Sequence, residues 1–316
     1  MFNQKRCVSI IIPCLNEQEV INTSYKRLTE VMSALNDKAY ELIFIDDGSH
    51  DATYELLTKI QQADPHVRLL KFSRNFGHQI AVSAGLDYAA GDAAVIIDAD
   101  LQDPPEVIPE MITKWEQGFD VVYGKRIKRQ GETKFKLFTA KLFYRILAKL
   151  TDIPIPLDTG DFRLIDRKVI ETLKKMPEKD RFIRGMVAWA GFNVVGLPYV
   201  RQQRIVGKSK YPLFKMIKFA LDGIMSFSLK PLRLASILGF ITAGFALVGM
   251  IYALIKYFLH LNVTGWTALF LAILFLSGIQ LLMLGVIGEY LGRTYMETKN
   301  RPLYLIESAT GFEKHE

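Results

Sequence analysis

The chain has 316 residues, half of them hydrophobic, and a formal net charge of +7 at pH 7. This length allows one large globular domain with additional elements, and the positive mean hydropathy argues against an ordinary soluble enzyme. A chain that is both basic and apolar is expected to have a membrane or a polyanion as its partner.

The two cysteines, Cys7 and Cys14, lie in or beside the first apolar run. They form no spaced framework, which predicts reduced thiols in the cytosol. Basic residues precede this run, but the run is too short for the apolar region of a signal peptide followed by a cleavage site. We therefore expect the N-terminal domain to stay in the cytosol.

Between Val8 and Gly124, short β-branched runs alternate with amphipathic stretches of helical length. Four nearly continuous apolar runs are typical of strands buried on both faces of a parallel sheet: VSIIIP, YELIFIDDGS, VRLLKFS and DAAVIIDAD. The helices predicted between them are Gln18 to Leu35, Asp51 to Ala63 and Gln79 to Ala89. The alternation predicts an α/β fold with right-handed crossovers.

Polar residues lie at the carboxyl end of each predicted strand, where open α/β sheets bind their ligands. They are Asn16 and Glu17 after the first strand, Asp46 and Asp47 at the end of the second, Arg74 and Asn75 after the third, and Asp98 and Asp100 at the end of the fourth. We expect one pocket to collect these side chains.

The stretch IIDADLQDPPE, residues 96–106, ends the fourth predicted strand in a group of acids. In an extended chain residues i and i+2 point the same way, so Asp98 and Asp100 are expected to face one side, with Gln102 continuing the alternation. Two carboxylates and an amide oxygen are suited to a hard divalent cation, Mg²⁺ or Mn²⁺, that bridges a diphosphate. An isolated Asp-x-Asp is also common in turns, so this prediction depends on its combination with the second strand end.

The stretch FIDDGSHDAT, residues 44–53, ends the second strand with an Asp pair and turns at Gly48. An Asp pair at the carboxyl end of a strand is suited to binding ribose hydroxyls or a base N–H group. Ser49, Asp51 and Thr53 are explained by capping and turn chemistry. No Gly-x-Gly-x-x-Gly motif follows a predicted strand, which argues against a dinucleotide-dependent dehydrogenase.

Past Gly124 the chain becomes strongly basic, with nine Lys or Arg against one Glu between Lys125 and Leu150. Basic and apolar residues interleave there at helical spacing, which predicts a basic amphipathic helix, residues 133–150, on an anionic bilayer. A surface helix with a solvated face is the alternative. A second interfacial helix is predicted from Lys210 to Ser228.

Two uncharged stretches, Leu234 to Ile255 and Leu261 to Gly288, are each long enough to cross a hydrocarbon core of about 30 Å. The short loop between them, around His260 to Gly265, carries no Lys or Arg, so the positive-inside rule predicts a hairpin with both ends in the cytoplasm. Lys256, near the outer end of the first stretch, is the one dissenting charge and can reach the interface with its long side chain. A buried hairpin in a soluble protein is the alternative. The predicted organisation is a cytoplasmic domain (1–207), a juxtamembrane amphipathic helix (208–230), a transmembrane hairpin (231–290) and a cytoplasmic tail (291–316).

These motifs together resemble the bacterial polyprenyl-phosphate glycosyltransferases of glycosyltransferase family 2, which are relatives of dolichol-phosphate mannose synthase. The resemblance extends over nearly the whole chain and is carried by IIPCLNE, IDDGSHDAT, RNFGHQIAVSAGLDYAAGD, DADLQDPPE, DTGDFRLIDR and GKSKYPLFKMIKFALDGI, followed by the hairpin. It implies a Rossmann-like GT-A catalytic domain of the α/β class, interfacial helices and a C-terminal transmembrane hairpin.

On the donor side, the resemblance implies a metal site made by Asp98, Asp100 and Gln102. It also implies a nucleotide site lined by Pro13, Asn16, Glu17 and Asp46, to which we add Asp47 and Asp98. His78 is interpreted as a polar residue at a helix start, because no second histidine lies nearby to make a ligand pair.

On the acceptor side, Arg126 matches an arginine on a mobile loop, where it can meet donor or acceptor phosphate. Asp158 and Asp161 match acidic positions close to the sugar and the acceptor, and with Asp100 and Arg126 they complete the predicted catalytic set. Arg204 and Lys210 match basic residues that handle phosphates near the membrane. Headgroup attraction is the alternative for the basic residues, and turn chemistry around Gly160 for the two acids. The segment 181–185 is an acceptor-side contact or a helix end, and we leave it out of the catalytic set.

The resemblance implies inverting transfer of a hexosyl group from a nucleotide diphosphate sugar to undecaprenyl phosphate at the cytoplasmic face of the inner membrane. We expect UDP-glucose as the donor, with UDP-N-acetylglucosamine or another donor sugar as the alternative. A lipid phosphate, with a second pKa of about 6, is mostly dianionic at pH 7, so no general base is strictly required. Expected partners are the bilayer, a flippase, a downstream glycosyltransferase and further copies of this chain.

Three other classes of function were weighed. A processive polysaccharide synthase usually needs more membrane spans and a Gln-x-x-Arg-Trp motif, which the chain lacks. A non-catalytic, membrane-anchored nucleotide-sugar-binding subunit would not need to keep a metal site and a phosphate-binding arginine together. A nucleic-acid partner is not expected, because the positive charge gathers beside the predicted spans.

Overall fold

The computed structural model describes residues 5–127, 159–202, 228–259 and 265–312. These residues belong to two compact units, one of which contains the N-terminal part and residues 301–312, while the other contains residues 228–259 and 265–300. The predicted interfacial helices 133–150 and 210–228 lie almost wholly outside the described residues. So do three predicted site residues: Asp158, Arg204 and Lys210.

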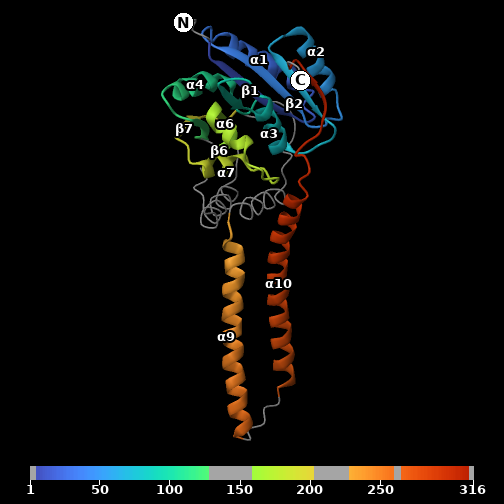
Figure 1. Cartoon of the computed structure of the whole chain (residues 1–316), viewed down its shortest axis with the longest axis vertical. Coiled ribbons are helices and arrows are strands. Elements are labelled where there is room, and N and C mark those ends of the chain that lie inside the picture. The colour runs from blue at the N-terminus through green and yellow to red at the C-terminus, as the bar shows by residue number, and fades with distance from the viewer. Residues whose placement is uncertain (1–4, 128–158, 203–227, 260–264, 313–316) are drawn as a thin grey trace. The chain divides into compact units, whose positions relative to one another are not determined.

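The first unit is built on a mixed sheet whose described strands run in the order β7-β5-β6-β4-β1-β2-β3-β8 (Figure 1). The strands are β1 (Cys7–Cys14), β2 (Ala39–Asp46), β3 (Val67–Phe72), β4 (Ala93–Ile96), β5 (Val121–Arg126), β6 (Thr159–Asp166), β7 (Val194–Tyr199) and β8 (Ile306–Thr310). β4, β1, β2 and β3 are mutually parallel, as the alternating pattern predicts. β6 and β8 are antiparallel to their neighbours.

The described helices of this unit are α1 (Ile21–Ser33), α2 (Thr53–Ala63), α3 (His78–Tyr88), the 3₁₀ turn η1 (Pro105–Val107), α4 (Ile108–Glu116), α6 (Arg167–Lys174) and α7 (Ile183–Ala190). Three of them, α1 to α3, follow strands in the predicted alternation, and the others were not predicted. The buried residues of α1 recur every three or four positions, so one face of this helix packs on the sheet. The α/β fold class predicted from the sequence is confirmed.

Helix α3 differs from the others because six consecutive residues, 81–86, are buried. Its small side chains let it lie very close to the sheet: a Cβ on Gly85 would come within 2.3 Å of Cγ2 of Ile11. The first residues of α3 are thereby held beside the carboxyl ends of the central strands. His78, the first residue of α3, therefore lies at the same edge of the sheet as the residues that end those strands.

The C-terminal segment returns to the sheet as β8, which pairs antiparallel with β3. The Tyr304 ring stacks on Phe72 with centroids 5.2 Å apart, and Ser308 Oγ lies 3.0 Å from the Tyr54 hydroxyl. From the sequence these residues were expected in a cytoplasmic tail, and no strand was predicted there. β8 pairs with β3, more than 200 residues earlier in the sequence, and a local sequence pattern cannot predict such a pairing.

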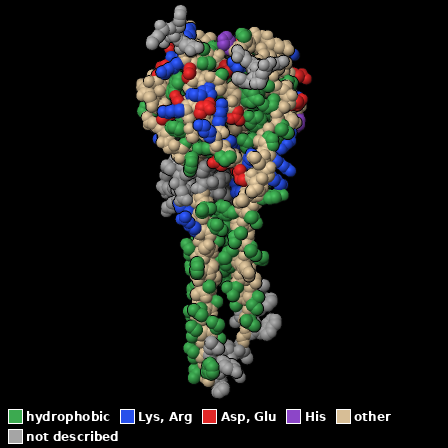
Figure 2. All heavy atoms as spheres, in the orientation of Figure 1, with side chains coloured by type: hydrophobic (Ala, Val, Ile, Leu, Met, Phe, Trp, Pro, Cys, Tyr) green, Lys and Arg blue, Asp and Glu red, His purple; other side chains and the backbone are tan. Residues whose placement is uncertain are grey.

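The second unit contains two long helices, α9 (Lys230–Phe258) and α10 (Trp266–Thr298), which run side by side (Figure 1). Within them, Lys230–Ala253 and Phe275–Thr298 are long and apolar enough to cross a membrane. Hydrophobic side chains lie along the visible face of both helices (Figure 2). Phe240 is 80% exposed and Phe245 is 74% exposed, which argues against the alternative of a buried hairpin in a soluble core.

Candidate active site

The predicted site residues that the structure describes gather at one edge of the sheet, the carboxyl ends of the parallel strands. β5 and β7 are parallel to each other and end at this edge, and the antiparallel strand β6 begins there. The strand-end residues are Asn16 and Glu17 after β1, Asp46 and Asp47 at β2, Asp98 and Asp100 after β4, Arg126 at β5 and Asp161 in β6. Pro13 lies within β1, beside Ile45 of β2.

The turns after β1 and β2 are tied together through Asn16. This residue adopts a left-handed backbone with φ of 53°, its side-chain oxygen accepts from His50 N at 2.9 Å, and its own N–H donates to Ser49 Oγ at 3.0 Å. Gly48, with φ of 72°, has no room for a side chain, because a Cβ there would lie 2.6 Å from the carbonyl carbon of Arg74. These contacts fix the shape of the predicted nucleotide side.

The two acids at the end of β2 have different surroundings. Asp47 accepts from Phe76 N at 2.7 Å and from Gly77 N at 3.0 Å, so its carboxylate holds the loop before α3. Asp46 is fully buried; its Oδ1 accepts from Ser49 N, and its Oδ2 has no hydrogen-bond partner among the described residues. Burial raises the pKa of this carboxyl. Asp46 therefore offers an acceptor to a ligand N–H or O–H group, whereas a nucleotide contact by Asp47 stays a prediction.

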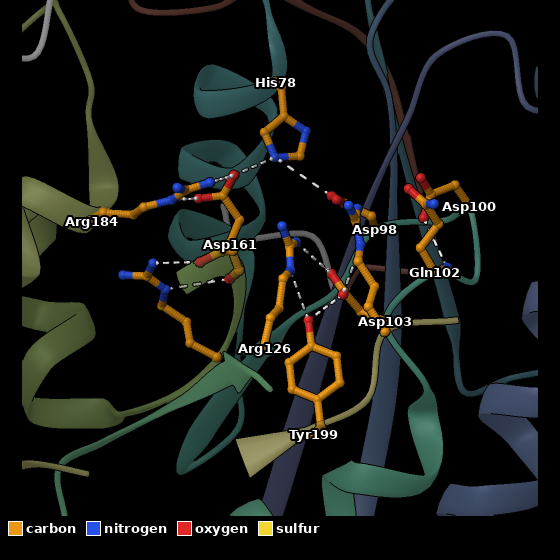
Figure 3. Close-up of polar contacts among 12 residues, drawn as sticks. His78, Asp98, Asp100, Gln102, Asp103, Arg126, Asp161, Arg184 and Tyr199 are labelled. Carbon is orange, nitrogen blue, oxygen red and sulfur yellow. Dashed lines mark hydrogen bonds and ion pairs between the residues drawn. The ribbon is translucent and has the colours of Figure 1, made fainter. Parts of the chain in front are cut away.

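The Asp-x-Asp stretch is a turn in the structure, which corrects one part of the sequence analysis. β4 ends at Ile96, and Leu101 has a left-handed φ of 58°. The extended alternation through Gln102 was therefore wrong. Instead, Gln102 N donates to Asp100 Oδ1 at 3.1 Å, and the Asp98 carboxylate points towards His78 (Figure 3).

His78, the first residue of α3, lies between two carboxylates. Its Nε2 is 3.3 Å from Asp161 Oδ2 and 3.6 Å from Asp98 Oδ1. Burial lowers the pKa of His78, but these two carboxylates outweigh that effect and raise it to about 9. The interpretation of His78 as a helix-start residue was therefore incomplete: the search for a second histidine missed its acidic partners, which come from other strands.

Asp161 accepts hydrogen bonds from two helices. Arg184, on α7, donates to its two oxygens at 2.8 and 3.1 Å, and Gln79, on α3, donates to Oδ2 at 3.2 Å. Burial favours the protonated acid, but Arg184 and His78 reverse this and hold the pKa of Asp161 well below its usual value. The sequence analysis left Arg184 outside the catalytic set, although it is the closest basic partner of a predicted catalytic acid.

Arg126 belongs to a second polar group, on the β5 and β7 side of the site (Figure 3). Its Nε donates to the Tyr199 hydroxyl at 3.2 Å, and one terminal nitrogen lies 3.5 Å from Asp103 Oδ2. The Tyr199 hydroxyl in turn donates to Asp103 Oδ1. Asp103 is completely buried. In the sequence it was noted only as one of the acids after the fourth strand, without a role, and Tyr199 was not singled out.

The donor set of the turn fits a divalent cation. Burial raises the pKa of Asp98 to about 6 against the opposing effect of His78, and three further carboxylates add to the rise: Asp161, Asp100 and Asp103. A cation would relieve this crowding. No three His, Cys, Asp or Glu side chains group as ligands within the described ranges, so Asp98, Asp100 and Gln102 would hold a cation only together with oxygens of a ligand.

The model of glycosyl transferase family 2 matches residues 9–174, more than half of the chain, and a model of the GtrB C-terminal hairpin matches residues 230–294. The chain belongs to glycosyltransferase family 2. The resemblance stated from the motifs is thereby confirmed, and the protein is a glycosyltransferase with a GT-A fold.

Full-length relatives agree with this assignment. The chain is 53% identical to the uncharacterized glycosyltransferase YkcC of Bacillus subtilis (strain 168), over 96% of this chain and 94% of that protein. It is 42% identical to the prophage bactoprenol glucosyl transferase homolog of Escherichia coli (strain K12), over 95% and 98% of the two chains. Among solved structures, glucosyl-3-phosphoglycerate synthase from Mycobacterium tuberculosis matches with a TM-score of 0.47 and 21% identity, over 70% of this chain and 79% of that one.

Proposed function

We propose that this glycosyltransferase moves a hexosyl group from a nucleotide diphosphate sugar to a polyprenyl phosphate. The observation that carries the proposal is the 42% identity to the bactoprenol glucosyl transferase of Shigella phage SfII, over 96% of this chain and 98% of that protein. That alignment takes in both the catalytic unit and the hairpin. On the basis of this sequence similarity, UDP-glucose is the proposed donor and undecaprenyl phosphate is the proposed acceptor.

The reaction would be a direct displacement. An oxygen of the acceptor phosphate forms a bond to the anomeric carbon while the bond from that carbon to the β-phosphate oxygen breaks, and the nucleoside diphosphate leaves with the electron pair. This step inverts the anomeric configuration. Because the attacking phosphate is already an anion near pH 7, no proton has to be removed from it.

Asp161 would orient other groups rather than accept a proton. Arg184 and Gln79 donate to its carboxylate, and His78 lies 3.3 Å from it. Its pKa is held well below the usual value, which makes it a weak base. It keeps Arg184 and His78 at the edge where the sugar and the acceptor phosphate would meet.

Bringing an anion to a diphosphate is the main electrostatic cost of the reaction, and basic side chains would offset it. Arg126 and Arg184 are the described candidates, and Arg204 and Lys210 stay predictions outside the described residues. A Mg²⁺ or Mn²⁺ ion held by Asp98, Asp100 and Gln102 would supply further positive charge to the diphosphate. The orphan oxygen of Asp46 would receive an N–H or O–H group of the nucleotide.

The hairpin would anchor the enzyme where the acceptor is found. Lys230 and Arg233 lie at the start of α9 and Arg293 near the end of α10, while the loop between the helices carries no Lys or Arg. The positive-inside rule then favours a cytoplasmic catalytic unit. The product, a polyprenyl-phosphate sugar, would serve cell-envelope glycosylation after a flippase moves it across the membrane.

The proposal is tested by incubating detergent-purified protein with Mg²⁺ or Mn²⁺, undecaprenyl phosphate and radiolabelled UDP-glucose or UDP-N-acetylglucosamine. We expect label in the organic phase with UDP-glucose, no label after chelation with EDTA, and no label with Asp100→Asn. Asp37→Asn, an exposed acid away from the site, is the matched control and is expected to keep full activity.

The outcomes separate the candidate functions. Lipid label only from UDP-N-acetylglucosamine would keep the reaction and change the donor. No lipid label from either donor, with UDP binding still measurable by calorimetry, would mean another donor sugar or the non-catalytic subunit, and further donor sugars would separate these two. Full activity of Asp100→Asn would contradict the metal assignment.

A further inference from the structure

We propose that Asp103 is a positioning residue that aims the Arg126 guanidinium at the reacting phosphates. This role rests on the proposed function, because the phosphates that Arg126 would bind are those of the proposed reaction. Asp103 lies three residues beyond Asp100, in the turn that would hold the cation, and it joins this turn to β5 and β7 (Figure 3).

The burial of Asp103 calls for an explanation. Its side chain is 0% exposed, and a buried carboxylate is costly unless cations and hydrogen bonds compensate it. Arg126 lies 3.5 Å from Oδ2, Arg201 lies 3.5 Å from Oδ1, and the Tyr199 hydroxyl donates to Oδ1. Buried ion pairs are often no more stable than apolar side chains of similar size, so stability alone does not account for this arrangement.

The contacts of Arg126 restrict its guanidinium to one orientation. Nε is bound to the Tyr199 hydroxyl at 3.2 Å, and a terminal nitrogen faces Asp103. Gly160 leaves the space that the group occupies, since a Cβ there would lie 2.4 Å from that terminal nitrogen. A planar cation that is hydrogen-bonded at Nε and paired with a carboxylate at a terminal nitrogen is partly pre-organised for phosphate binding, so it loses less freedom when the phosphate arrives.

Tyr199 is itself fixed as the bridge between the two charged groups. Its ring packs edge-on against Phe162 with centroids 5.6 Å apart, and Gly124 makes room for it, because a Cβ there would lie 2.7 Å from the ring. Tyr199 and Arg126 are register partners in the parallel pair of β7 and β5. These contacts restrict the ring and hold the hydroxyl between Arg126 and Asp103.

The turn that carries Asp103 is also held firmly. Leu101 adopts a left-handed backbone, which is unfavourable for a bulky residue and persists only where the surroundings impose it. Gln102 O accepts from Gln202 N at 2.9 Å, three residues past Tyr199. The donor-side turn and the segment that leads to Arg204 are thus joined at Asp103 and at Gln102.

The test is a double-mutant cycle on lipid labelling, with kcat and KM measured for both substrates. Asp103→Asn removes the charge and keeps the shape, and Tyr199→Phe removes only the hydroxyl. Each is expected to lower kcat by about tenfold, the scale of loss when a catalytic group is misdirected, and to leave the Kd for UDP within about twofold. When Asp103→Asn or Tyr199→Phe is added to Arg126→Gln, we expect a further fall in kcat of less than about twofold.

Tyr25→Phe is the matched control. The Tyr25 hydroxyl also donates to a carboxylate, that of Asp64, at 2.9 Å, but Tyr25 lies on α1, away from Arg126. It is expected to leave kcat unchanged. If Asp103→Asn does not fold, Tyr199→Phe still tests the proposal. The positioning role alone would be overturned if Asp103→Asn or Tyr199→Phe lowered kcat by the same factor in the Arg126→Gln chain as in the wild-type chain. It would also be overturned if these changes lowered the melting temperature and left kcat unchanged. No lipid label from the wild-type chain would overturn the proposed function and this role with it.

Discussion

Asp161 and Arg184 form an ion pair in which the two side chains are only 14% and 20% exposed. Each side chain depends on the other, because an uncompensated charge at this depth is poorly solvated. Gln79 extends the pair by donating to Asp161 and accepting from Ile183 N at 3.1 Å. At the scale of residues, the site is therefore a set of mutually dependent charges rather than a row of independent groups.

Arg184→Gln is expected to lower the free energy of unfolding by about 2 kcal/mol, because it removes the closest basic partner of Asp161 and leaves its carboxylate to His78 and the more distant Arg163. Thermal or denaturant unfolding in detergent measures this change. The matched control is Lys168→Gln, which removes an exposed lysine from Asp120, whose carboxylate still accepts from Asn193 N, and it is expected to change stability little. Equal effects of the two substitutions would mean that Asp161 is solvated well enough to do without Arg184.

Strand β8 is the element whose role follows least directly from its own residues. It covers the outer edge of β3, and Leu305 O accepts from Ser73 N at 3.0 Å at the point where the chain enters the loop held by Asp47. Tyr304 stacks on Phe72 and donates to Asp87 at 2.8 Å. The strand thus closes an edge that is otherwise open to pairing with other chains, and it supports one wall of the predicted nucleotide side.

A chain that ends at residue 300 is expected to aggregate more and to bind UDP more weakly than the full chain. Loss of β8 leaves the backbone of β3 unpaired and exposes Phe72, which is 1% exposed in the full chain. Light scattering and calorimetry measure the two effects. A chain that ends at Phe312 keeps the whole strand and serves as the control. Unchanged UDP affinity in the shorter chain would remove β8 from any role at the site.

The whole molecule combines two units with opposite surfaces. The first buries its large apolar side chains under helices, whereas α9 and α10 expose theirs along most of their length. Water does not favour such helices, and a hydrocarbon phase does. The described part of the second unit therefore has the surface of a membrane hairpin.

Leu247→Arg is expected to reduce membrane integration, because a charge near the centre of a spanning helix costs about 2.5–3.5 kcal/mol. The measurement is the fraction of protein that stays in membranes during alkaline extraction. Leu229→Arg, beside Lys230 at the start of α9, is the control and is expected to integrate normally. Similar extraction of the two variants would contradict the position of α9 in the hydrocarbon core.

The sequence by itself determined the order of the first four strands and of the three helices between them, the edge of the sheet that carries the polar residues, and the two apolar helices. These features have local causes: β-branched runs, helical periodicity, and uncharged stretches of sufficient length. The acids Asp46 and Asp98 were found because they end such runs, whereas Asp161 was found through the family resemblance. The family resemblance then supplied roles that no local pattern contains.

Only the tertiary structure decided which of these residues meet. Tyr199 and Asp103 are 96 residues apart in the sequence, and Gln79 and Asp161 are 82 residues apart. Strand β8 pairs with β3, which lies more than 200 residues earlier in the chain. The turn at Leu101 also follows from such contacts, because a leucine does not adopt a left-handed backbone by its own preference. Sequence patterns report the neighbours along the chain, and the chemistry of this site depends on neighbours in space.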